Sequence, residues 1–531
     1  MDVVIVGGGP NGLMLACELA LAGVRPVVLE RLAEPSPDPR SNGLVGQVVR
    51  VVDRRGLHER LSGTPGPPTP NTGYFMFAAM PLNLGLLADD PHPNSLHALP
   101  VPERDTVRVL EARARELGAD IRRGHEFTGL TQDDDGVTLT VATSDGTYQL
   151  RARYVVGADS AHSPVRKAAG IGFPGVTHDR TTTRSAHVTV PTDRLDPATG
   201  ALDVPGHGPV LPFLPVRTAR GGFTYAPLPG RPPLVATTEW DEAPTDEPMT
   251  LDELRASAAR VLGADVPLGP PPGPGPHVLR RLNGGNTRVA ERYRDGRVFL
   301  VGDAAHVFAA GGTGLNLGLQ DAVNLGWKLA AAINGTADVL DTYEAERRPV
   351  ADRTITYSRA QAALMAPGED VTGLREVFGE LLTQPGVVRV LANLVAGSDV
   401  RYPVDADAHP LAGRFAPDLD LRTPTGPVRL AELVRTARPL LIDLTADHHL
   451  TDHHLTDQDR ADRNPTGHDP DRDSDQDTAL PPAVEVVRAR ADTDLTALLL
   501  RPDSYVAWAS DDPRPDRDRL RAVAERWFGT P

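Results

Sequence analysis

The sequence predicts an α/β fold in three parts: a βαβ-type fold, an antiparallel sheet inserted into it, and a small C-terminal α/β unit. Three observations support this prediction. A strand, a glycine-rich turn, a helix and a second strand follow one another within the first thirty residues. Residues 177–285 consist of short apolar runs separated by Pro and Gly, as in antiparallel sheets. From about Ala412, strand-like runs and a terminal helix form a unit of their own.

The N-terminal segment predicts a Rossmann-like site for an ADP-containing cofactor rather than a glycine-rich turn that binds nothing. Residues 3–6 are four apolar β-branched residues, typical of a buried strand. Gly7, Gly9 and Gly12 then have the G-x-G-x-x-G spacing, which allows a tight turn, close approach of a pyrophosphate, and close helix–strand packing. The N–H groups at the start of the following helix favour phosphate. Glu30 ends the second strand, where its carboxylate can accept hydrogen bonds from ribose hydroxyls.

The remaining elements are predicted from apolar periodicity and from turn or capping residues. Two alternating runs flank Asp145-Gly146, which predicts a hairpin. Helices are predicted over residues 13–22, 48–57, 106–117, 251–262, 315–334, 339–359 and 517–528. Further strands are predicted over residues 26–29, 119–124, 138–141, 148–152, 154–159, 297–303, 440–444, 498–502 and 505–509.

Composition excludes several classes of function. The chain has 531 residues and a net charge of −16, which argues against a nucleic-acid partner because phosphate backbones require a basic face. We found no apolar run near the ~20 residues that span a bilayer and no signal peptide, so we expect a cytoplasmic protein without a membrane partner. The single cysteine, Cys17, excludes an intramolecular disulfide framework and is expected to be a core residue.

Residues 446–482 are crowded with Asp, His and Arg and almost free of apolar side chains. Such a segment cannot bury enough apolar surface to fold, so we expect a disordered insertion. Four histidines within it could share one helical face and take up a divalent metal: His448, His449, His453 and His454. The surrounding Leu-Thr-Asp repeat and high polarity favour an adventitious site, and we predict no functional metal site.

Three distant motifs identify a family resemblance. They are the N-terminal glycine motif with Glu30, the run Gly-Ala-Asp-Ser-Ala-His-Ser-Pro-Val-Arg at residues 157–166, and the Gly-Asp-Ala-Ala-His run at residues 302–306 with its continuation to residue 328. Together they resemble the FAD-dependent aromatic hydroxylases, or class A flavoprotein monooxygenases. The likeness is greatest to the bacterial branch that hydroxylates polyketide and related antibiotic skeletons. That branch also carries a C-terminal thioredoxin-like domain without redox cysteines, and this tail likewise has none.

The resemblance implies how the chain is divided. Residues 1–176 and 286–400 would form the Rossmann-like FAD-binding domain, the second part including long helices. Residues 177–285 would form the substrate-binding sheet, and residues 412–531 the thioredoxin-like domain. The substrate would lie between the inserted sheet and the flavin ring. The protein would be a monomer or a homodimer.

The resemblance also implies the cofactor site. Asp303 would accept a hydrogen bond from a ribityl hydroxyl, and the glycines that follow would let the backbone pass close to the flavin ring. The next helix would point its N-terminus at the pyrimidine end of the flavin and stabilise negative charge there. The predicted cofactor-binding residues are Gly7, Gly9, Pro10, Asn11, Gly12, Glu30, Arg31, Arg40, Glu103, Asp159, Asp303, Gly311, Gly312, Gly314, Leu315 and Asn316.

Some of these assignments have alternatives. Asp159 and Arg166 resemble a motif associated with FAD and nicotinamide binding, but they could instead form a structural ion pair. Arg40 lies where the family places an arginine near the cofactor, and a solvated loop arginine is the alternative. His306 is a conceivable base. Because it follows the Asp303 turn, we interpret it as a packing or hydrogen-bonding residue.

Three positions depart from the family's pattern. Ser160 stands where glycine is usual, which predicts a different backbone conformation. Residues 307–310 lack the usual proline and form a shorter segment, so we expect a less fixed loop beside the flavin. Glu103 stands where a glutamine commonly meets the cofactor. Its charge is unfavourable near phosphate unless it is paired, with Arg104 or Arg40 as candidate partners.

The expected function is that of a monooxygenase for a small aromatic, polyketide-type substrate. NAD(P)H would reduce FAD, and O₂ would form the flavin C4a-hydroperoxide that hydroxylates the aromatic ring. No side chain is identified as catalytic, because the flavin carries the chemistry. The alternatives are Baeyer–Villiger oxidation, epoxidation or antibiotic inactivation by the same cofactor, and a non-catalytic flavin-binding scaffold.

Overall fold

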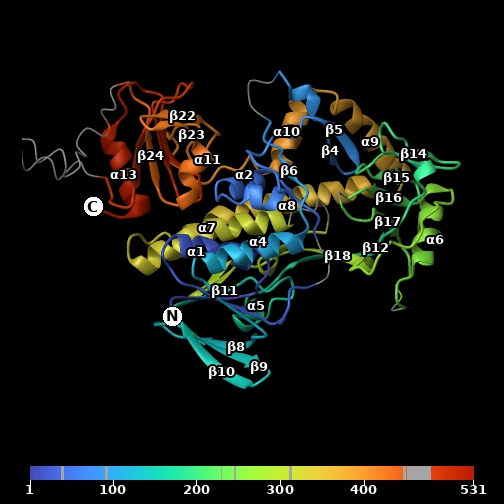
Figure 1. Ribbon diagram of the computed structural model, residues 1–531, viewed down its shortest axis with the longest axis horizontal. Helices are drawn as coiled ribbons and strands as arrows, with labels where there is room; N and C mark the ends of the chain where they lie inside the picture. Colours follow the sequence, from blue (N-terminus) through green and yellow to red (C-terminus); the bar gives the residue numbers. More distant parts are fainter. Residues whose placement is uncertain are drawn as a thin grey trace, which may run out of the picture.

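The computed structural model describes residues 1–36, 41–89, 94–228, 230–243, 245, 247–309, 314–446, 450 and 480–530. Figure 1 shows a central α/β layer, an antiparallel sheet on one side of it and the C-terminal unit on the other. The predicted mixed α/β fold is confirmed. Within the described ranges, no helix is both long enough and apolar enough to cross a membrane.

The central sheet has six strands in the order β19-β20-β11-β1-β2-β7, and all neighbours are parallel except β19 and β20. Parallel strands are covered on both faces, which explains why β1 is an uninterrupted apolar run with every residue buried. The strands are β1 (Val3–Val6), β2 (Val27–Glu30), β7 (Asp120–Arg123), β11 (Tyr154–Gly157), β19 (Arg294–Asp295) and β20 (Val298–Leu300).

Helices α1 (Pro10–Leu21), α4 (Glu103–Glu116) and α7 (Gly314–Asn334) lie side by side over this sheet (Figure 1). Helices α1 and α7 lie so close together that a Cβ added at Gly326 of α7 would overlap the side chain of Glu18 of α1. The predicted hairpin is present in a separate three-stranded sheet. Its strands are β8 (Glu126–Gln132), β9 (Val137–Thr143) and β10 (Gly146–Ala152).

Several shorter elements connect the large ones. The helix predicted over 48–57 ends earlier, at a turn with Gly56 in the left-handed region (φ 66°), after which α3 begins. The short elements are α2 (Gln47–Asp53), α3 (His58–Ser62), α5 (Pro164–Ala168), β3 (Leu44–Val45) and β6 (Ala98–Leu99).

Cys17 is buried in α1, where its Sγ donates to the carbonyl of Leu110, and burial raises the pKa of its thiol.

The inserted sheet has the order β15-β16-β17-β12-β18-β21 and is antiparallel throughout. Helix α6 (Leu251–Leu262) packs on it around a separate apolar core. Strand β21 belongs to the segment after the Asp303 turn, so one edge of this sheet lies beside the third motif. The strands are β12 (Gly175–His187), β15 (Val216–Thr218), β16 (Gly221–Ala226), β17 (Leu234–Trp240), β18 (Leu279–Val289) and β21 (His306–Val307). A further hairpin joins β13 (Leu202–Val204) and β14 (Gly208–Val210).

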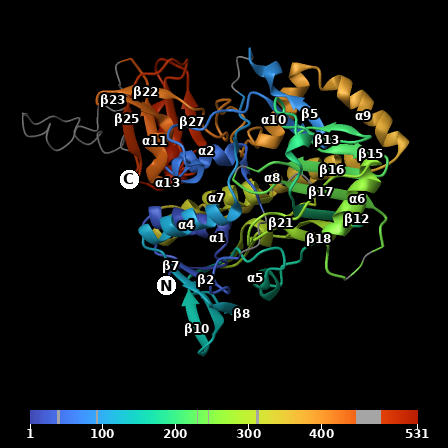
Figure 2. The ribbon, with the colours of Figure 1, turned by 45° about the vertical axis from the view of Figure 1, so that its right-hand side comes forward.

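Helix α8 (Thr342–Met365) follows α7 after a short connection and leads to α9 (Glu369–Leu381) and α10 (Pro385–Ala396), visible in Figure 2. These helices share an apolar core with the hairpin of β4 (Tyr74–Phe77) and β5 (Met80–Asn83). The sequence patterns predicted α8 but neither α9, α10 nor this hairpin.

The described part of the C-terminal unit contains a four-stranded sheet, ordered β25-β24-β26-β27, with helices α11 and α13 beside it (Figure 2). Its three predicted strands and its terminal helix are present, whereas β25 was not predicted. The proposed disordered insertion, with its four histidines, lies almost entirely outside the described residues. The elements are β22 (Asp420–Thr423), β23 (Gly426–Arg429), α11 (Leu430–Leu433), β24 (Leu440–Asp443), β25 (Glu485–Arg488), β26 (Ala497–Leu500), β27 (Val506–Ser510) and α13 (Arg517–Phe528).

Candidate cofactor and substrate site

A cavity of about 860 Å³ lies where the first and third motifs meet the inserted sheet. A second cavity of about 350 Å³ lies beside the glycine turn and the end of β2. Gly9, Glu103, Ala158 and Ser160 belong to the walls of both, so the two cavities adjoin around the glycine turn. The wall of the larger cavity includes Pro10, Asn11, Leu99, Phe213, Leu228, Asp303, Val307, Phe308, Gly314 and Leu315.

The glycine turn is shaped to receive a phosphate group. A Cβ added at Gly12 would overlap the carbonyl oxygen of Gly7, so this position tolerates only glycine without a backbone shift. At Gly9, by contrast, an added Cβ would meet no protein atom within 4 Å, because it would enter the cavity. Helix α1 begins at Pro10 and has no side-chain cap, which leaves N–H groups at its start for an anion.

The carboxylate of Glu30 is fixed at the end of β2. Its Oε2 accepts from the backbone N–H of Gly8 at 2.8 Å, and its Oε1 accepts from that of Leu32 at 2.9 Å. Glu30 and Arg31 both line the smaller cavity beside the glycine turn. A carboxylate held here fits the ribose of an adenosine whose phosphates reach the start of α1.

Replacing Glu30 with alanine is expected to weaken FAD binding by about 1–3 kcal/mol, because hydrogen-bond donors of the ribose and of Gly8 would lose a charged acceptor. A fluorescence titration of the apoprotein with FAD measures this. Glu34→Ala, at an exposed residue of the same connection, is the control. An FAD affinity in Glu30→Ala equal to that of the control would refute the assignment.

Asp159 and Arg166 do not form the ion pair considered from the sequence. Oδ2 of Asp159 accepts from the backbone N–H of Val165 at 2.9 Å. Arg166 instead donates to the carbonyls of Ala304 and Ala161, at 2.8 and 2.9 Å. Among the described residues, the buried Oδ1 of Asp159 has no hydrogen-bond partner, and burial raises the pKa of this carboxyl. Because Asp159 lines the smaller cavity, its open acceptor fits a hydroxyl group of a bound ligand.

Ser160 adopts φ 75°, in the left-handed region that favours glycine. The serine thus adopts a glycine-like conformation despite its side chain. Such a conformation is strained for a residue with a Cβ.

We expect Ser160→Gly to raise the free energy of unfolding by about 1 kcal/mol, because glycine adopts this conformation without strain. Ser160→Ala retains the Cβ and is expected to bring no such gain. Urea unfolding of the two variants and of the wild type measures the difference. Equal stability of the glycine and alanine variants would show that the backbone there is not strained.

The third motif is held by a buried cluster around Asp321. Nε2 of His306 lies 2.6 Å from Oδ2 of Asp321, and Nε of Arg347 donates to Oδ1 at 2.7 Å. The backbone N–H of Gly302 also donates to Oδ2, at 3.3 Å. Burial alone would raise the pKa of Asp321, but Arg347 and His306 together lower it. His306 is thus a hydrogen-bonding residue of the core, and the cluster fixes the turn that places Asp303 in the cavity wall.

The segment after His306 is more fixed than expected. Val307 pairs with Arg288 in the inserted sheet, and the ring of Phe308 stacks on that of His306 with centroids 5.3 Å apart. The expectation of a loose loop is therefore wrong for Val307 and Phe308, because β21 ties this segment to β18. Residues 310–313, which include Gly311 and Gly312, lie outside the described residues, as does Arg40.

Three further predicted residues differ in their placement. Asn11 lies against Gly302 and Gly318, and its buried Oδ1 has no partner within the described ranges. Glu103 lies in the walls of both cavities. Asn316 does not reach the larger cavity; its Oδ1 instead accepts from the backbone N–H of Val45 at 3.1 Å.

The sequence predicted a substrate between the inserted sheet and the flavin and singled out residues 307–310, but it did not identify Phe213 and Leu228, which form an apolar side of the cavity together with Phe308. Phe213 has φ 59° and is 46% exposed, an unusual conformation for a bulky aromatic residue. No sequence pattern marks these residues, because they meet only when the inserted sheet folds against the third motif. Among the described residues, no group of three or more His, Cys, Asp or Glu side chains is placed to hold a metal ion.

Comparisons with known proteins agree with this geometry. Residues 1–358 match the FAD-binding domain family, and residues 409–531 match the aromatic-ring hydroxylase C-terminal family. A 12-dehydrotetracycline 5-monooxygenase/anhydrotetracycline 6-monooxygenase of Streptomyces rimosus is 41% identical, over 100% of this chain and 99% of the relative. A rifampicin monooxygenase of Streptomyces venezuelae is 37% identical over 99% and 98%, respectively.

The fold agrees as well. The structure of the anhydrotetracycline hydroxylase OxyS from Streptomyces rimosus superimposes with a TM-score of 0.81 at 39% identity, covering 100% of this chain and 99% of that one. Motifs, cavity and both matched families point to one class of protein. The chain belongs to the FAD-dependent aromatic hydroxylases, the class A flavoprotein monooxygenases.

Proposed function

We propose that this protein uses FAD, NAD(P)H and O₂ to hydroxylate an aromatic polyketide-type substrate. The observation that carries the proposal is the 860 Å³ cavity, which adjoins the glycine turn and is walled by the inserted sheet on its other side. Its volume is in the range of cavities that bind drug-sized ligands. The tetracycline-type names of the relatives support a polycyclic aromatic substrate over the alternative outcomes.

In this proposal the adenosine half of FAD lies in the smaller cavity with Glu30, Arg31 and Asp159. The pyrophosphate lies at the start of α1, and Asp303 accepts a hydrogen bond from the ribityl chain. We also assign Arg40, Gly311 and Gly312 to the proposed site. When bound, FAD supplies the redox and oxygen-transfer chemistry, whereas the protein binds, orients and excludes water.

The N-terminus of α7 is proposed to stabilise negative charge on the bound flavin. Gly314 and Leu315 lie in the cavity wall at the N-terminus of a 21-residue helix. The partial positive charge of a helix N-terminus and its free N–H groups would stabilise negative charge on the pyrimidine end of the flavin. No side chain is assigned as a catalytic acid or base.

The substrate is proposed to lie against the apolar side chains of the inserted sheet and the third motif. Phe213, Leu228 and Phe308 offer ring faces and aliphatic surface to a flat aromatic ligand. We assign residues 177–285 to substrate binding, residues 1–176 and 286–400 to FAD, and residues 412–531 to a thioredoxin-like domain. We further propose a cytoplasmic monomer or homodimer without nucleic-acid or membrane partners.

The test is stimulation of NADPH oxidation by substrate. Anhydrotetracycline and other polycyclic phenols are added to the FAD-loaded protein, with NADH compared in parallel. We expect at least one compound to accelerate NADPH or NADH oxidation and to gain one oxygen atom in its mass. If no aromatic compound in the set changes the rate or the mass, the proposal in this form is wrong.

A further inference from the structure

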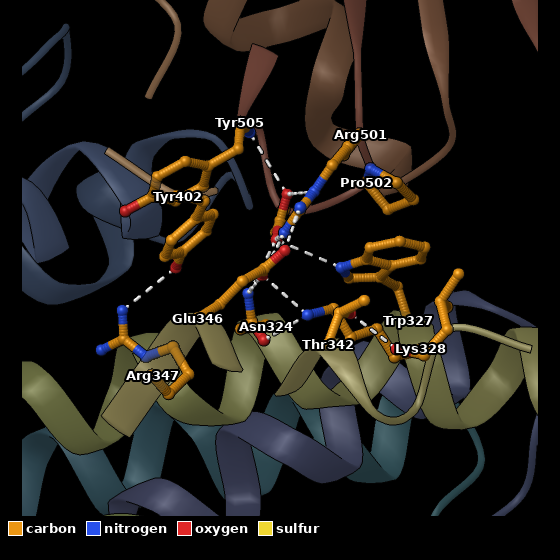
Figure 3. Close-up of polar contacts among 12 residues, drawn as sticks. Asn324, Trp327, Lys328, Thr342, Glu346, Arg347, Tyr402, Arg501, Pro502 and Tyr505 are labelled. Atoms are coloured by element: carbon orange, nitrogen blue, oxygen red, sulfur yellow. Dashed lines mark hydrogen bonds and ion pairs between the residues drawn. The ribbon is translucent and has the colours of Figure 1, made fainter. Parts of the chain in front are cut away.

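A buried cluster of charges joins the C-terminal unit to helices α7 and α8 (Figure 3). Arg501 donates from both terminal nitrogens to the carboxylate of Glu346, at 2.6 and 2.8 Å, and also binds Asp503. Oδ2 of Asp503 accepts from Nε1 of Trp327 and Nδ2 of Asn324, both at 3.2 Å. The C-terminal unit thus places one arginine and one aspartate directly against both helices.

The cluster is enclosed and balanced in charge. Lys328 is fully buried and donates to Oε2 of Glu346 at 2.7 Å and to Oδ1 of Asn324 at 2.9 Å. The guanidinium of Arg501 lies 4.6 Å from the ring centroid of Trp527. Lys328 and Arg501 face two carboxylates, from Glu346 and Asp503. A set of buried ions with several shared hydrogen bonds has little freedom to rearrange.

A second line of contacts leads from the cluster towards the cavity. The ring of Tyr505 stacks on that of Tyr402, with centroids 4.0 Å apart. The hydroxyl of Tyr402 accepts from Nη1 of Arg347 at 3.1 Å, and Arg347 follows Glu346 on α8. Arg347 is the residue that binds Asp321 beneath the third motif.

Both lines end at the proposed flavin site. Asp321 is hydrogen-bonded to the ring of His306 and to the backbone N–H of Gly302. These two residues lie on either side of Asp303, which belongs to the cavity wall. Helix α7 carries Asn324 and Lys328 in its middle and has its first residues in the same wall. The C-terminal unit has no cysteine and therefore cannot carry out thiol–disulfide exchange.

We propose that Arg501 and Tyr402 are positioning residues of the flavin site, through which the C-terminal unit sets the placement of the Asp303 turn and the start of α7. They act through Glu346, Arg347 and Asp321 and touch neither cofactor nor substrate. The proposal rests on the proposed function only for the identity of the bound flavin and the product that is measured.

Two variants of the full-length protein test this. Tyr402→Phe removes the hydroxyl that binds Arg347 and keeps the ring stack, so it is expected to fold. Arg501→Lys keeps the charge and loses the paired hydrogen bonds to Glu346. Arg429→Ala is the matched control, because Arg429 joins the C-terminal unit to Asp53 at 2.9 Å outside both lines of contact.

The readouts are the FAD dissociation constant of the apoprotein, the visible spectrum of the bound flavin, and the ratio of product to NADPH consumed. We expect Tyr402→Phe to weaken FAD binding roughly 2- to 30-fold, the range for mutations that alter coupling between distant sites. A shifted flavin spectrum and a lower product ratio should accompany the change, and Arg501→Lys should do the same.

The decisive comparison is between the FAD affinities of these two variants and that of Arg429→Ala, with the thermal stability of each variant measured alongside. If Tyr402→Phe and Arg501→Lys leave FAD affinity and spectrum unchanged, as expected for the control, the contacts only dock the unit and the positioning role is wrong. FAD affinity needs no substrate, so this outcome is independent of the proposed function. An absence of substrate oxidation in the wild type would instead refute that function.

Discussion

Replacing Asp321 with alanine should lower the free energy of unfolding by about 3–5 kcal/mol, the cost of breaking a buried ion pair by removing one partner. Arg347 and His306 are both fully buried and would lose their carboxylate partner. The N–H of Gly302 would lose its acceptor as well. The effect is measured from urea unfolding of the apoprotein, followed by tryptophan fluorescence and circular dichroism.

Asp352→Ala provides the control for this prediction. Asp352 pairs with Arg348 at 3.4 Å on the surface of α8, where such pairs contribute about 0–1 kcal/mol. If Asp321→Ala is no less stable than Asp352→Ala, the cluster does not hold the third motif in the way described. Asp321→Asn keeps the side-chain volume and isolates the loss of charge.

The second large effect is expected at the glycine turn. Gly12→Ala would place a Cβ onto the carbonyl oxygen of Gly7, so it is expected to lower stability by about 1–3 kcal/mol and to abolish FAD retention. Gly9→Ala is expected to keep the stability of the apoprotein, because its Cβ meets no protein atom. It should still weaken FAD binding by about 1–3 kcal/mol, since the methyl group would occupy space that the pyrophosphate requires.

This pair of variants separates folding from cofactor binding. FAD content after purification and a titration of the apoprotein measure binding, and urea unfolding measures stability. If Gly9→Ala binds FAD as tightly as the wild type, the pyrophosphate does not lie at the glycine turn. If Gly12→Ala is as stable as the wild type, the close contact between α1 and the turn is not rigid.

Local patterns predicted the core of the fold well. The run at residues 3–6, the glycine spacing and Glu30 lie within one βαβ unit, where each element follows from its neighbours in the sequence. The helices α6, α7 and α13 were likewise predicted, because periodicity and capping residues mark their ends. The family resemblance predicted Asp303 as a cofactor-binding residue, and Asp303 lies in the cavity wall.

What could not be predicted depends on contacts between distant segments. The Asp321–Arg347 pair joins two helices. Asp321 lies in the continuation of the third motif, but nothing in the sequence marks Arg347 as its partner. Phe213 belongs to the inserted segment and lines the cavity only because that segment folds against the third motif. No residue of α9 is buried, and β25 has only four residues, so the apolar patterns of both are weak. Helix α10 has 12 residues, as many as the predicted α6, and was missed. Asn316 was assigned to the cofactor, but its position in α7 turns its side chain towards Val45.

The central claim, oxygen transfer from O₂ to an aromatic substrate at the FAD site, is tested most directly by isotope labelling. The FAD-loaded protein is incubated with NADPH, ¹⁸O₂ and the aromatic compound that best stimulates NADPH oxidation, and the product is examined by mass spectrometry. We predict that each product molecule carries one ¹⁸O atom, and that Gly9→Ala, given the same FAD, forms far less of this product. A product whose new oxygen comes from water, or a product formed equally without FAD, would contradict it.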